Sequence, residues 1–406
     1  MRFKDAFEHV ENYVIETRRE LHRLAEPSDQ EKNTFAFIIE EIRKLGFSYE
    51  IVEEFTVVAK LQTGRNGKTV ALRADIDGLP VKENKHNLKR ERTCISNRSD
   101  ASHMCGHDAH VAMLLASMKV LKEIQDELVG TYYFCFEQGE ELGRRKGVTA
   151  ILNYLDEQCI DTVWAIHVYN KLKAGKICVD AGPRMAGVAG AMVKVIGKGG
   201  HGSRPDLSNN PVYAAANILV NLGGVFTNRI DANETVTCGI TTLTGGGTPN
   251  VFSDEAILAG TFRFFNVEEG RKAVDLFKNV SEHTAAMYDC FVEFDEKTKV
   301  LGVPVITNKE CSEFAKKSLP EFIGDNCITS CDKWYASESF SAYTSMYPSV
   351  FAFLGIDNEE EGSGAEHHSE FFDIDEKVLM IGVKATVGYA TSFAKINKEE
   401  KIDVGS

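Results

Sequence analysis

The densest group of reactive side chains lies in the segment 102–110, which reads SHMCGHDAH. A thiol, imidazoles and a carboxylate stand close together there, and these are the ligand types of zinc and similar transition metals. A metal site, a thiol nucleophile with a histidine base, half of a disulfide and a chance cluster on a loop all fit these residues. A Cys-x-His pair is weak evidence alone, so the choice depends on what the rest of the chain brings to it.

Further candidate groups lie elsewhere in the chain: Asp75 and Asp77, Glu140 and Glu141, His167, and His367 with His368. The first three lie near the ends of predicted strands, where a parallel sheet gathers its functional residues. Neighbouring side chains after a strand point in different directions, so one glutamate of a pair can bind metal while the other acts as general base. Asp75 and Asp77 point the same way on an extended strand and are expected to orient a ligand.

The elements that position these groups follow from the apolar pattern. We expect helices over 1–24, 31–47 and 110–124, and strands over 68–81, 130–141 and 161–170, with the first strand ending near Asp75 and the last on His167. This alternation predicts an α/β layer structure with a largely parallel central sheet. From about residue 187 a βαββαβ pattern predicts a ferredoxin-like unit. We therefore expect one α/β domain of residues 1–186 and 301–406, interrupted by an α+β domain of residues 187–300.

Composition excludes several classes of protein. The net charge of −14 argues against a nucleic-acid surface, and the one basic run, 82–92, fits a solvated loop. No apolar run is long enough to span a membrane, and the N-terminus lacks the apolar core of a signal peptide. Ten cysteines among 406 residues are too sparse for a disulfide scaffold. A reducing cytoplasm is the expected location.

Eight ordered segments carry a family resemblance over nearly the whole chain. They read RRELHRLAEPSDQEKNTFAFIIEEIRKLGF, ALRADIDGLPV, HMCGHDAHVAMLLAS, EQGEE, AIHV, GKGGHGSRPDLSNNPV, GGTPNVFSDEAILAGTFR and HHSEFFDIDE. In this order they resemble the M20 metallopeptidase family, and most closely its amidohydrolase branch of hippurate hydrolase, auxin-conjugate hydrolases and N-acyl-amino-acid deacylases. The resemblance implies a zinc-peptidase-like catalytic domain with a mixed central sheet, plus an inserted ferredoxin-like dimerisation or lid domain.

The same resemblance assigns a dinuclear metal centre. The implied ligands of two divalent ions, with one ligand bridging, are Cys105, His107, Glu141, His167 and His368. Zinc or manganese is the expected metal, with cobalt or nickel as further candidates. His368 is preferred to His367 because Ser369 follows it. Glu140 is the implied general base. Asp75, Asp77 and Asp108 are expected to support the ligands.

The implied substrate contacts come from both domains. His201, in a Gly-rich loop of the inserted domain, is expected to reach the active site of a partner subunit and polarise the scissile carbonyl. Asn250 and Arg263 match positions that hold the backbone or carboxylate of the substrate, and His103 is a further pocket residue. The partners implied are small N-acyl amino acids or dipeptides and a second copy of the chain, in a homodimer or a tetramer.

The predicted reaction is hydrolysis of the amide bond of N-acyl amino acids by a metal-activated water. A dipeptidase or carboxypeptidase on the same scaffold is the nearest alternative; a thiol enzyme using Cys105 and His107, and a non-catalytic binding protein, are more distant ones. Four positions depart from the branch pattern: Gln138, Asn170 and Glu370 stand where proline is usual, and Ser339 where aspartate is usual. These departures bear on the substrate more than on the hydrolytic chemistry.

Overall fold

The computed structural model describes residues 2–143 and 145–396. It divides into two compact units. Unit 1 consists of Met1–Gly182, Ile306–Asp332 and Ala342–Ser406, and unit 2 of Pro183–Val305 and Lys333–Ser341. The short segment Lys333–Ser341 joins unit 2 because Trp334 exchanges backbone hydrogen bonds with Arg184 and Ala186. From the sequence, this segment was expected in the catalytic domain, and the inserted domain was expected to span 187–300.

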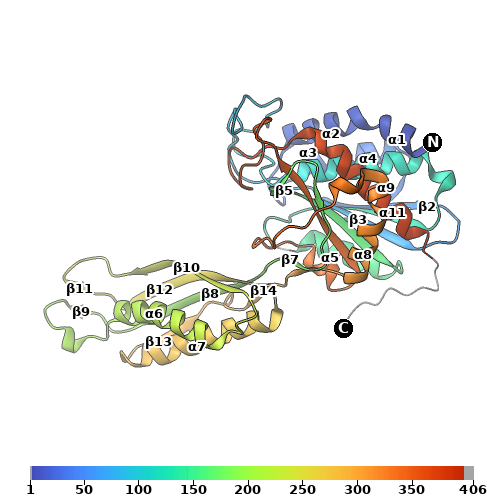
Figure 1. The fold of residues 1–406 in the computed structure, drawn as a ribbon. Coiled ribbons are helices and arrows are strands. Elements are labelled where there is room, and N and C mark those ends of the chain that lie inside the picture. Colours follow the sequence, from blue (N-terminus) through green and yellow to red (C-terminus); the bar gives the residue numbers. More distant parts are fainter. Residues whose placement is uncertain (1, 144, 397–406) are drawn as a thin grey trace. The chain divides into compact units, whose positions relative to one another are not determined.

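Unit 1 is built on a seven-stranded sheet in the order β1-β2-β4-β3-β5-β16-β6 (Figure 1). The strands are β1 (Ser48–Glu53), β2 (Thr56–Gln62), β3 (Thr69–Asp75), β4 (Thr131–Glu137), β5 (Thr162–Lys173), β6 (Ile177–Cys178) and β16 (Ser349–Asp357). The neighbours β4, β3, β5 and β16 run parallel, and the outer pairings are antiparallel. The expected mixed central sheet is confirmed.

Helices cover both faces of this sheet. They are α1 (Arg2–Glu8), α2 (Glu11–Leu24), α3 (Lys32–Lys44), α4 (His107–Glu123), α5 (Lys146–Asp156), α8 (Lys309–Ser318), α9 (Pro320–Ile323), α10 (Ser341–Thr344) and α11 (Leu379–Ala394). Along β4, Phe134 joins the core beneath α4, while its neighbour Tyr133 contacts Tyr154 of α5 on the other face. The first helix was expected to be continuous. It breaks after Glu8, and the turn buries both Phe7 and Val10.

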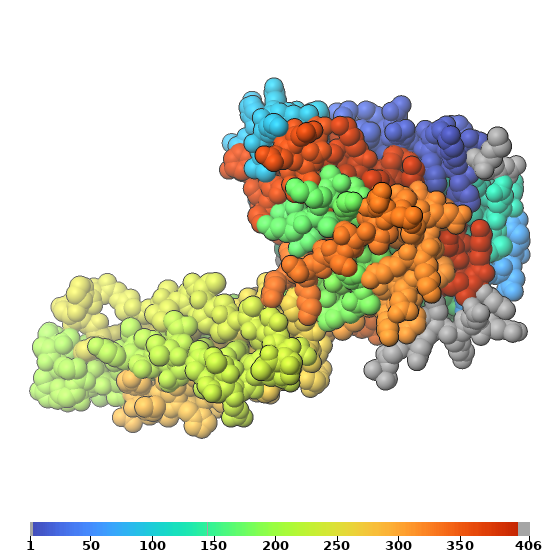
Figure 2. Space-filling view, in the orientation of Figure 1, coloured from blue at the N-terminus to red at the C-terminus, as the bar shows by residue number. Residues whose placement is uncertain are grey.

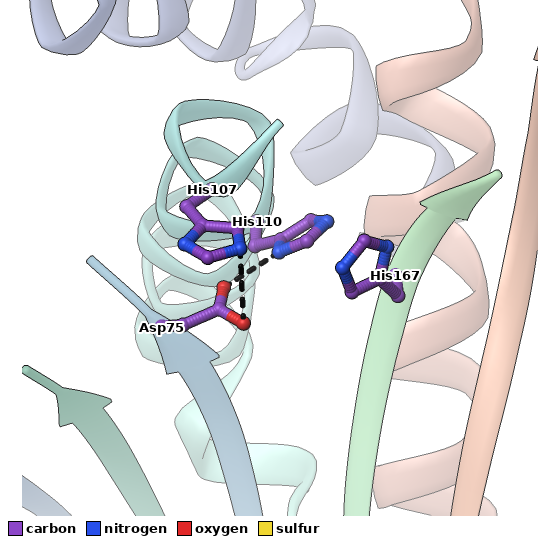
Figure 3. A group of neighbouring side chains, drawn as sticks. All are labelled: Asp75, His107, His110 and His167. Carbon is purple, nitrogen blue, oxygen red and sulfur yellow. Dashed lines mark hydrogen bonds and ion pairs between the residues drawn. The ribbon is translucent and has the colours of Figure 1, made fainter. Parts of the chain in front are cut away.

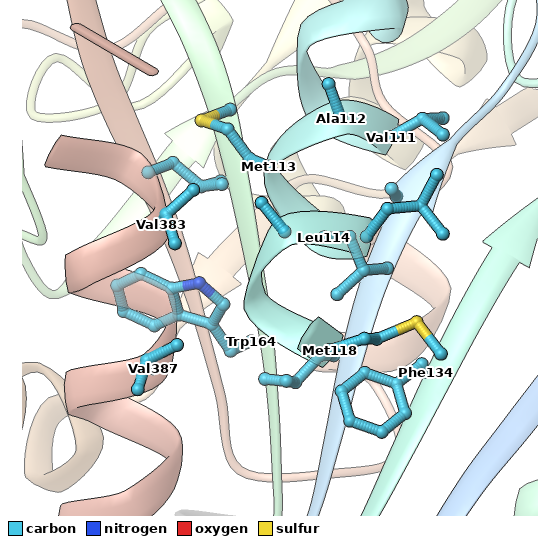
Figure 4. Close-up of a cluster of buried hydrophobic side chains, with 14 of the residues drawn as sticks. Val111, Ala112, Met113, Leu114, Met118, Phe134, Trp164, Val383 and Val387 are labelled. Atoms are coloured by element: carbon cyan, nitrogen blue, oxygen red, sulfur yellow. The ribbon is translucent and has the colours of Figure 1, made fainter. Parts of the chain in front are cut away.

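The core of unit 1 lies where α4 and α11 pack on the sheet (Figure 4). Helix α4 is apolar on nearly all sides because it is buried on nearly all sides. Gly382 of α11 allows the close approach, since a Cβ there would lie 2.1 Å from the sulfur of Met113. Val383 and Val387 of α11 complete the contact with Trp164 of β5. The start of α4 is thus held rigidly above the ends of the central strands.

Strand β5 corrects one sequence expectation. It was expected to end on His167, but it continues to Lys173. It continues because β16 pairs with it beyond that point, with Gly355 opposite Tyr169. His167 therefore lies within the strand, opposite Phe353 of β16, and this pairing fixes its backbone.

Unit 2 has the chain order β8 (Gly187–Ile196), α6 (Pro211–Arg229), β10 (Val236–Gly245), β12 (Glu255–Phe264), α7 (Val267–Ala286) and β13 (Phe291–Phe294). Its sheet runs β10-β12-β8-β13 with antiparallel neighbours, and β14 (Val300–Gly302) also pairs with β8. This is the ferredoxin-like βαββαβ arrangement expected from the sequence. The remaining short strands are β7 (Gly182–Met185), β9 (Gly200–His201), β11 (Val251–Phe252) and β15 (Val305–Thr307). None of the described helices is long and apolar enough to cross a membrane.

Candidate metal centre

Two overlapping groups of metal-type side chains lie at the carboxyl ends of the parallel strands. One comprises Asp75, His107, His110 and His167, and the other Cys105, His107 and Glu141. Figure 3 shows His107 and His110 pointing from α4 toward Asp75, with His167 facing them from β5. Gly106 makes the bend before α4 possible. Its φ is 87°, and a Cβ there would lie 2.4 Å from Val168.

His107 is oriented so that one ring nitrogen is left for a cation. Its Nδ1 lies 3.1 Å from Oδ1 of Asp77, which fixes the ring. Its Nε2 lies 3.7 Å from Oε1 of Glu141, and both of these atoms are buried without a hydrogen-bond partner. Two unsatisfied buried polar atoms at this separation suit a divalent ion bound to both at the usual lengths of about 2.0–2.2 Å. The residues present therefore fit a metal.

Cys105 belongs to the second group and also lies close to His167 of the first. Its sulfur is 3.7 Å from Nε2 of His167, whose Nδ1–H donates to the carbonyl of Val168 at 2.7 Å. Burial, and then the charge of Glu141, raise the pKa of the Cys105 thiol well above its usual range. A thiol nucleophile needs a lowered pKa, so this environment argues against the thiol-enzyme alternative.

Both downstream histidines come to the centre, in different ways. Nε2 of His368 lies 3.3 Å from Oε1 of Glu141, and its side chain is 52% exposed. His367 is half-buried and packs against Phe372, and its Nδ1 lies 3.7 Å from the sulfur of Cys105. His368, the residue expected as a ligand, thus extends the row of ligand atoms past Glu141 toward solvent.

The loop that carries these histidines is tied down by the basic loop 82–92. Asn84 donates to the carboxylate of Glu370 at 3.0 Å, and Arg92 donates to the carbonyls of Glu370 and Phe372. Figure 2 shows the two segments packed together, light blue and orange-red, at the top of unit 1. Asn170 holds the same loop from β5, donating to Glu366 at 3.2 Å. Two of the unusual residues, Asn170 and Glu370, therefore act as tethers.

His110, the residue at which the sequence predicted the helix 110–124 to begin, also belongs to the centre. Its Nδ1 lies 2.6 Å from Oδ1 of Asp75, and its Nε2 accepts from the backbone N–H of Val168 at 3.0 Å. Both nitrogens are thus occupied, so His110 fits an orienting role better than that of a ligand. Its i,i+3 spacing from His107 was the available signal, since such residues share one helix face.

Asp75 lies within a buried ionic row. Arg73 donates to Asp75 at 2.8 Å and to Glu137 at 3.0 Å. Although burial opposes it, the Arg73 guanidinium holds the pKa of Asp75 well below its usual range. Asp75 also approaches Nε2 of His107 at 3.7 Å. A buried carboxylate is thereby kept charged beside the proposed ligands.

Asp108 and His103 lie on the side of α4 that faces α2. Asp108 forms an ion pair with Nε of Arg18 at 2.8 Å and pairs with His22 at 2.7 Å, so it holds the start of α4 against α2. His103 is 1% exposed, and neither of its ring nitrogens has a hydrogen-bond partner. Burial lowers the pKa of His103 to about 4, which keeps the ring neutral. Arg18 and His22 were not among the residues predicted for the site, because their partner Asp108 lies far along the chain.

The expected substrate residues of unit 2 lie toward opposite ends of its sheet. His201 in β9 pairs with Val251 of β11, and Gly202 donates to the carbonyl of Asn250 at 2.7 Å, so His201 and Asn250 are neighbours. Arg263 lies near the other end of β12, opposite Val188. The side chains of His201 and Asn250 are exposed.

Comparison with known proteins supports the family expectation. The chain matches Peptidase family M20/M25/M40 over residues 71–392. It is 30% identical to the IAA-amino acid hydrolase ILR1-like 4 of Arabidopsis thaliana, over 97% of this chain and 89% of that one. It is also 30% identical to thermostable carboxypeptidase 1 of Saccharolobus solfataricus, over 97% of this chain and 98% of that one. The crystal structure of the YXEP protein of Bacillus subtilis, described as a dinuclear metal binding peptidase, has a TM-score of 0.80 at 25% identity, covering 96% of this chain and 99% of that one.

Proposed function

The chain belongs to peptidase family M20/M25/M40, and from that premise we propose that it is a metal-dependent amidohydrolase that cleaves N-acyl amino acids. One observation carries the proposal. The unsatisfied buried atoms of His107 and Glu141 face each other beside the sulfur of Cys105. His167 and His368 extend this row of ligand atoms on either side.

We assign two divalent ions to these five residues, zinc or manganese first and cobalt or nickel next. When bound, such ions lower the pKa of a water molecule and polarise a carbonyl oxygen. Asp77 prepares the site by occupying Nδ1 of His107, and the Val168 carbonyl does the same for His167. Each ring therefore presents Nε2 to the centre.

Glu140 is the proposed general base. It follows the end of β4 directly before Glu141, so its side chain leaves the turn in another direction than the ligand does. It takes a proton from the attacking water as the water oxygen bonds to the amide carbon. It then returns that proton to the amine nitrogen as the C–N bond breaks, which leaves a carboxylic acid and an amino acid.

The residues of unit 2 support an active site built from two copies of the chain. Arg263 lies opposite Val188, near the start of β8, whereas His201 comes after Ile196, where β8 ends. Val188 and Ile196 are eight residues apart. That separation is about 27 Å along a strand, too far for both side chains to contact one small substrate. We therefore propose that His201 and Asn250 complete the site of a second copy of the chain, and that Arg263 holds the substrate separately from them.

Unit 2 also offers a surface for the second copy. Strand β10 pairs only with β12 among the described strands, and most of its residues are exposed. Helix α6 has no charged residue before Arg229, and its outer face exposes Tyr213 (62%) and Val220 (73%). An open strand edge beside an uncharged helix face suits a symmetric dimer, with a tetramer as a further assembly.

The cysteines support the expected cytoplasmic location. All ten are free thiols in the structure. Seven of them are buried or partly buried in unit 1. In a reducing environment, such thiols stay reduced and pack as small apolar side chains.

The test is a substrate panel with the enzyme reconstituted in manganese, zinc or cobalt. N-acetyl and N-benzoyl amino acids are compared with free dipeptides. Faster hydrolysis of the acylated amino acids supports the deacylase, and faster hydrolysis of the dipeptides supports the carboxypeptidase or dipeptidase alternative, which the carboxypeptidase relative favours. Turnover that survives a chelator without metal would contradict both.

A further inference from the structure

The turn 138–141, which carries Glu140 and Glu141, is held by side chains from three separate segments. It begins where β4 ends, and Gly139 has a φ of 70°. The backbone N–H of Gly139 donates to Oε1 of Glu31 at 2.9 Å, and that of Glu141 donates to Oδ2 of Asp77 at 3.0 Å. Turn amides that would otherwise need water are thus satisfied by carboxylates.

Gln138 ties the same turn to the β1–β2 hairpin. Its side chain is buried, and its Oε1 accepts from the backbone N–H of Phe55 at 2.7 Å and from the hydroxyl of Thr56 at 3.3 Å. Its Nε2 donates to Asp29 at 3.3 Å, in the loop before α3. A proline, usual here in the resembling branch, makes none of these side-chain bonds. In this chain, the turn is therefore held by the hydrogen bonds of Gln138 and not by a proline ring.

Glu31 is an unusual side chain to bury. It is 0% exposed, and its Oε2 has no hydrogen-bond partner. Burial, and then the nearby charge of Asp77, raise the pKa of Glu31 to about 8. Capping of α3 does not explain why Glu31 is buried, because Glu26 already accepts from the backbone amides of Asn33 and Thr34 at the start of that helix. The bond to Gly139 is the contact that reaches the turn.

We propose that Glu31 and Gln138 are positioning residues, which together clamp the turn 138–141 and so aim the base Glu140 and the ligand Glu141. The proposal rests on the proposed function for the roles of those two glutamates. The clamp itself is a statement about the turn and is measurable without turnover. Misplacing a catalytic group by about 1 Å lowers the rate by about a hundredfold, so a loosened turn has a large kinetic effect.

The experiment compares Glu31→Met and Gln138→Met with Glu31→Gln, which keeps an acceptor for Gly139. Glu41→Met is the matched control, since Glu41 is a buried glutamate of α3 that bonds Tyr13 rather than the turn. Each full-length variant is reconstituted with cobalt. Amide hydrogen exchange over 138–142, the cobalt absorption spectrum, kcat and KM on an N-acetyl amino acid are measured.

We expect faster exchange over the turn and an altered cobalt spectrum in both methionine variants. Their kcat falls by about tenfold to a hundredfold while KM changes less than about threefold. Glu31→Gln stays within about threefold of wild type, and Glu41→Met keeps wild-type exchange over the turn. If Glu31→Met does not fold, Gln138→Met decides.

Unchanged exchange over 138–142 in a folded methionine variant would overturn the clamp, as would an equal loss of kcat in Glu41→Met. If the wild-type chain hydrolyses none of the substrates, the proposed function fails. The exchange and cobalt spectra then still decide the clamp: faster exchange with a changed spectrum supports it, and no change in either overturns it.

Discussion

The metal centre of unit 1 and the β9–β11 end of unit 2 both carry proposed active-site histidines, yet the chain treats them in opposite ways. His107 and His167 are 1–2% exposed, and each has one ring nitrogen fixed by a neighbour. The ring of His201 is exposed, and its Nδ1 lies 2.8 Å from the hydroxyl of the nearby Ser203. The first region is pre-organised within one chain, whereas we propose that the second gains rigid surroundings from a second copy.

The largest effect expected from this contrast comes from the base in unit 1. Glu140→Gln is expected to lower kcat by about 1,000-fold, because the attacking water loses its proton acceptor. The bound metal, measured by mass spectrometry, is expected to stay at the wild-type level, since Glu141 and not Glu140 is the proposed ligand. Loss of metal together with activity would make Glu140 a ligand instead.

The next effect tests whether unit 2 acts on a second copy. His201→Ala is expected to lower kcat by about a hundredfold, as removal of an oxyanion donor does. Co-expression with the Glu140→Gln chain restores about a quarter of wild-type activity, because half of the dimers are mixed and each has one complete site. A mixture as inactive as its parents would show that His201 acts within its own chain.

A smaller effect tests the pre-organisation of unit 1. Asp77→Asn is expected to weaken metal binding by about tenfold to a hundredfold, because the imidazole of His107 loses its charged partner. Competition with a metal-sensitive dye measures this affinity. Asp206→Asn in unit 2, an exposed partner of Arg204, is the control and leaves the affinity unchanged. Equal affinities for wild type and Asp77→Asn would contradict the orienting role.

The smallest effect concerns pH and stability. Glu31 keeps its proton up to about pH 8 in the folded chain, whereas the unfolded chain releases it near its ordinary value. The unfolded state then binds fewer protons, so this group lowers stability as pH rises, by about 2 kcal/mol between pH 6 and pH 8. Denaturant unfolding at the two pH values should show a smaller loss in Glu31→Gln than in wild type. Equal losses of unfolding free energy in wild type and Glu31→Gln would show that the proton is bound by a group other than Glu31.

The sequence predicted the parts of this site that depend on local pattern. The end of β3 at Asp75 and a helix close after Cys105 and His107 follow from periodicity, although α4 begins at His107 and not at the expected residue 110. The two units follow from the change of pattern near residue 187. These features are set by near neighbours in the chain, which explains why they are readable without a structure.

The supporting contacts were not predictable in the same way. His110 pairs with Asp75, and Gln138 with Phe55, across long stretches of chain. The i,i+3 spacing of His107 and His110 shows that they share a helix face, but it does not report these partners. The extension of β5 to Lys173 depends on pairing with β16, which comes much later in the sequence. Glu31 is the first residue of the predicted helix 31–47, and nothing in that local pattern reports its bond to Gly139, which is far along the chain.

The most direct test of the central claim is a count of metal ions in the wild-type chain, set beside its hydrolysis of an N-acetyl amino acid. We expect two divalent ions per chain, loss of turnover on chelation and recovery on adding metal back, with His107→Ala unable to recover. Full turnover by a metal-free chain, or by His107→Ala, would contradict it.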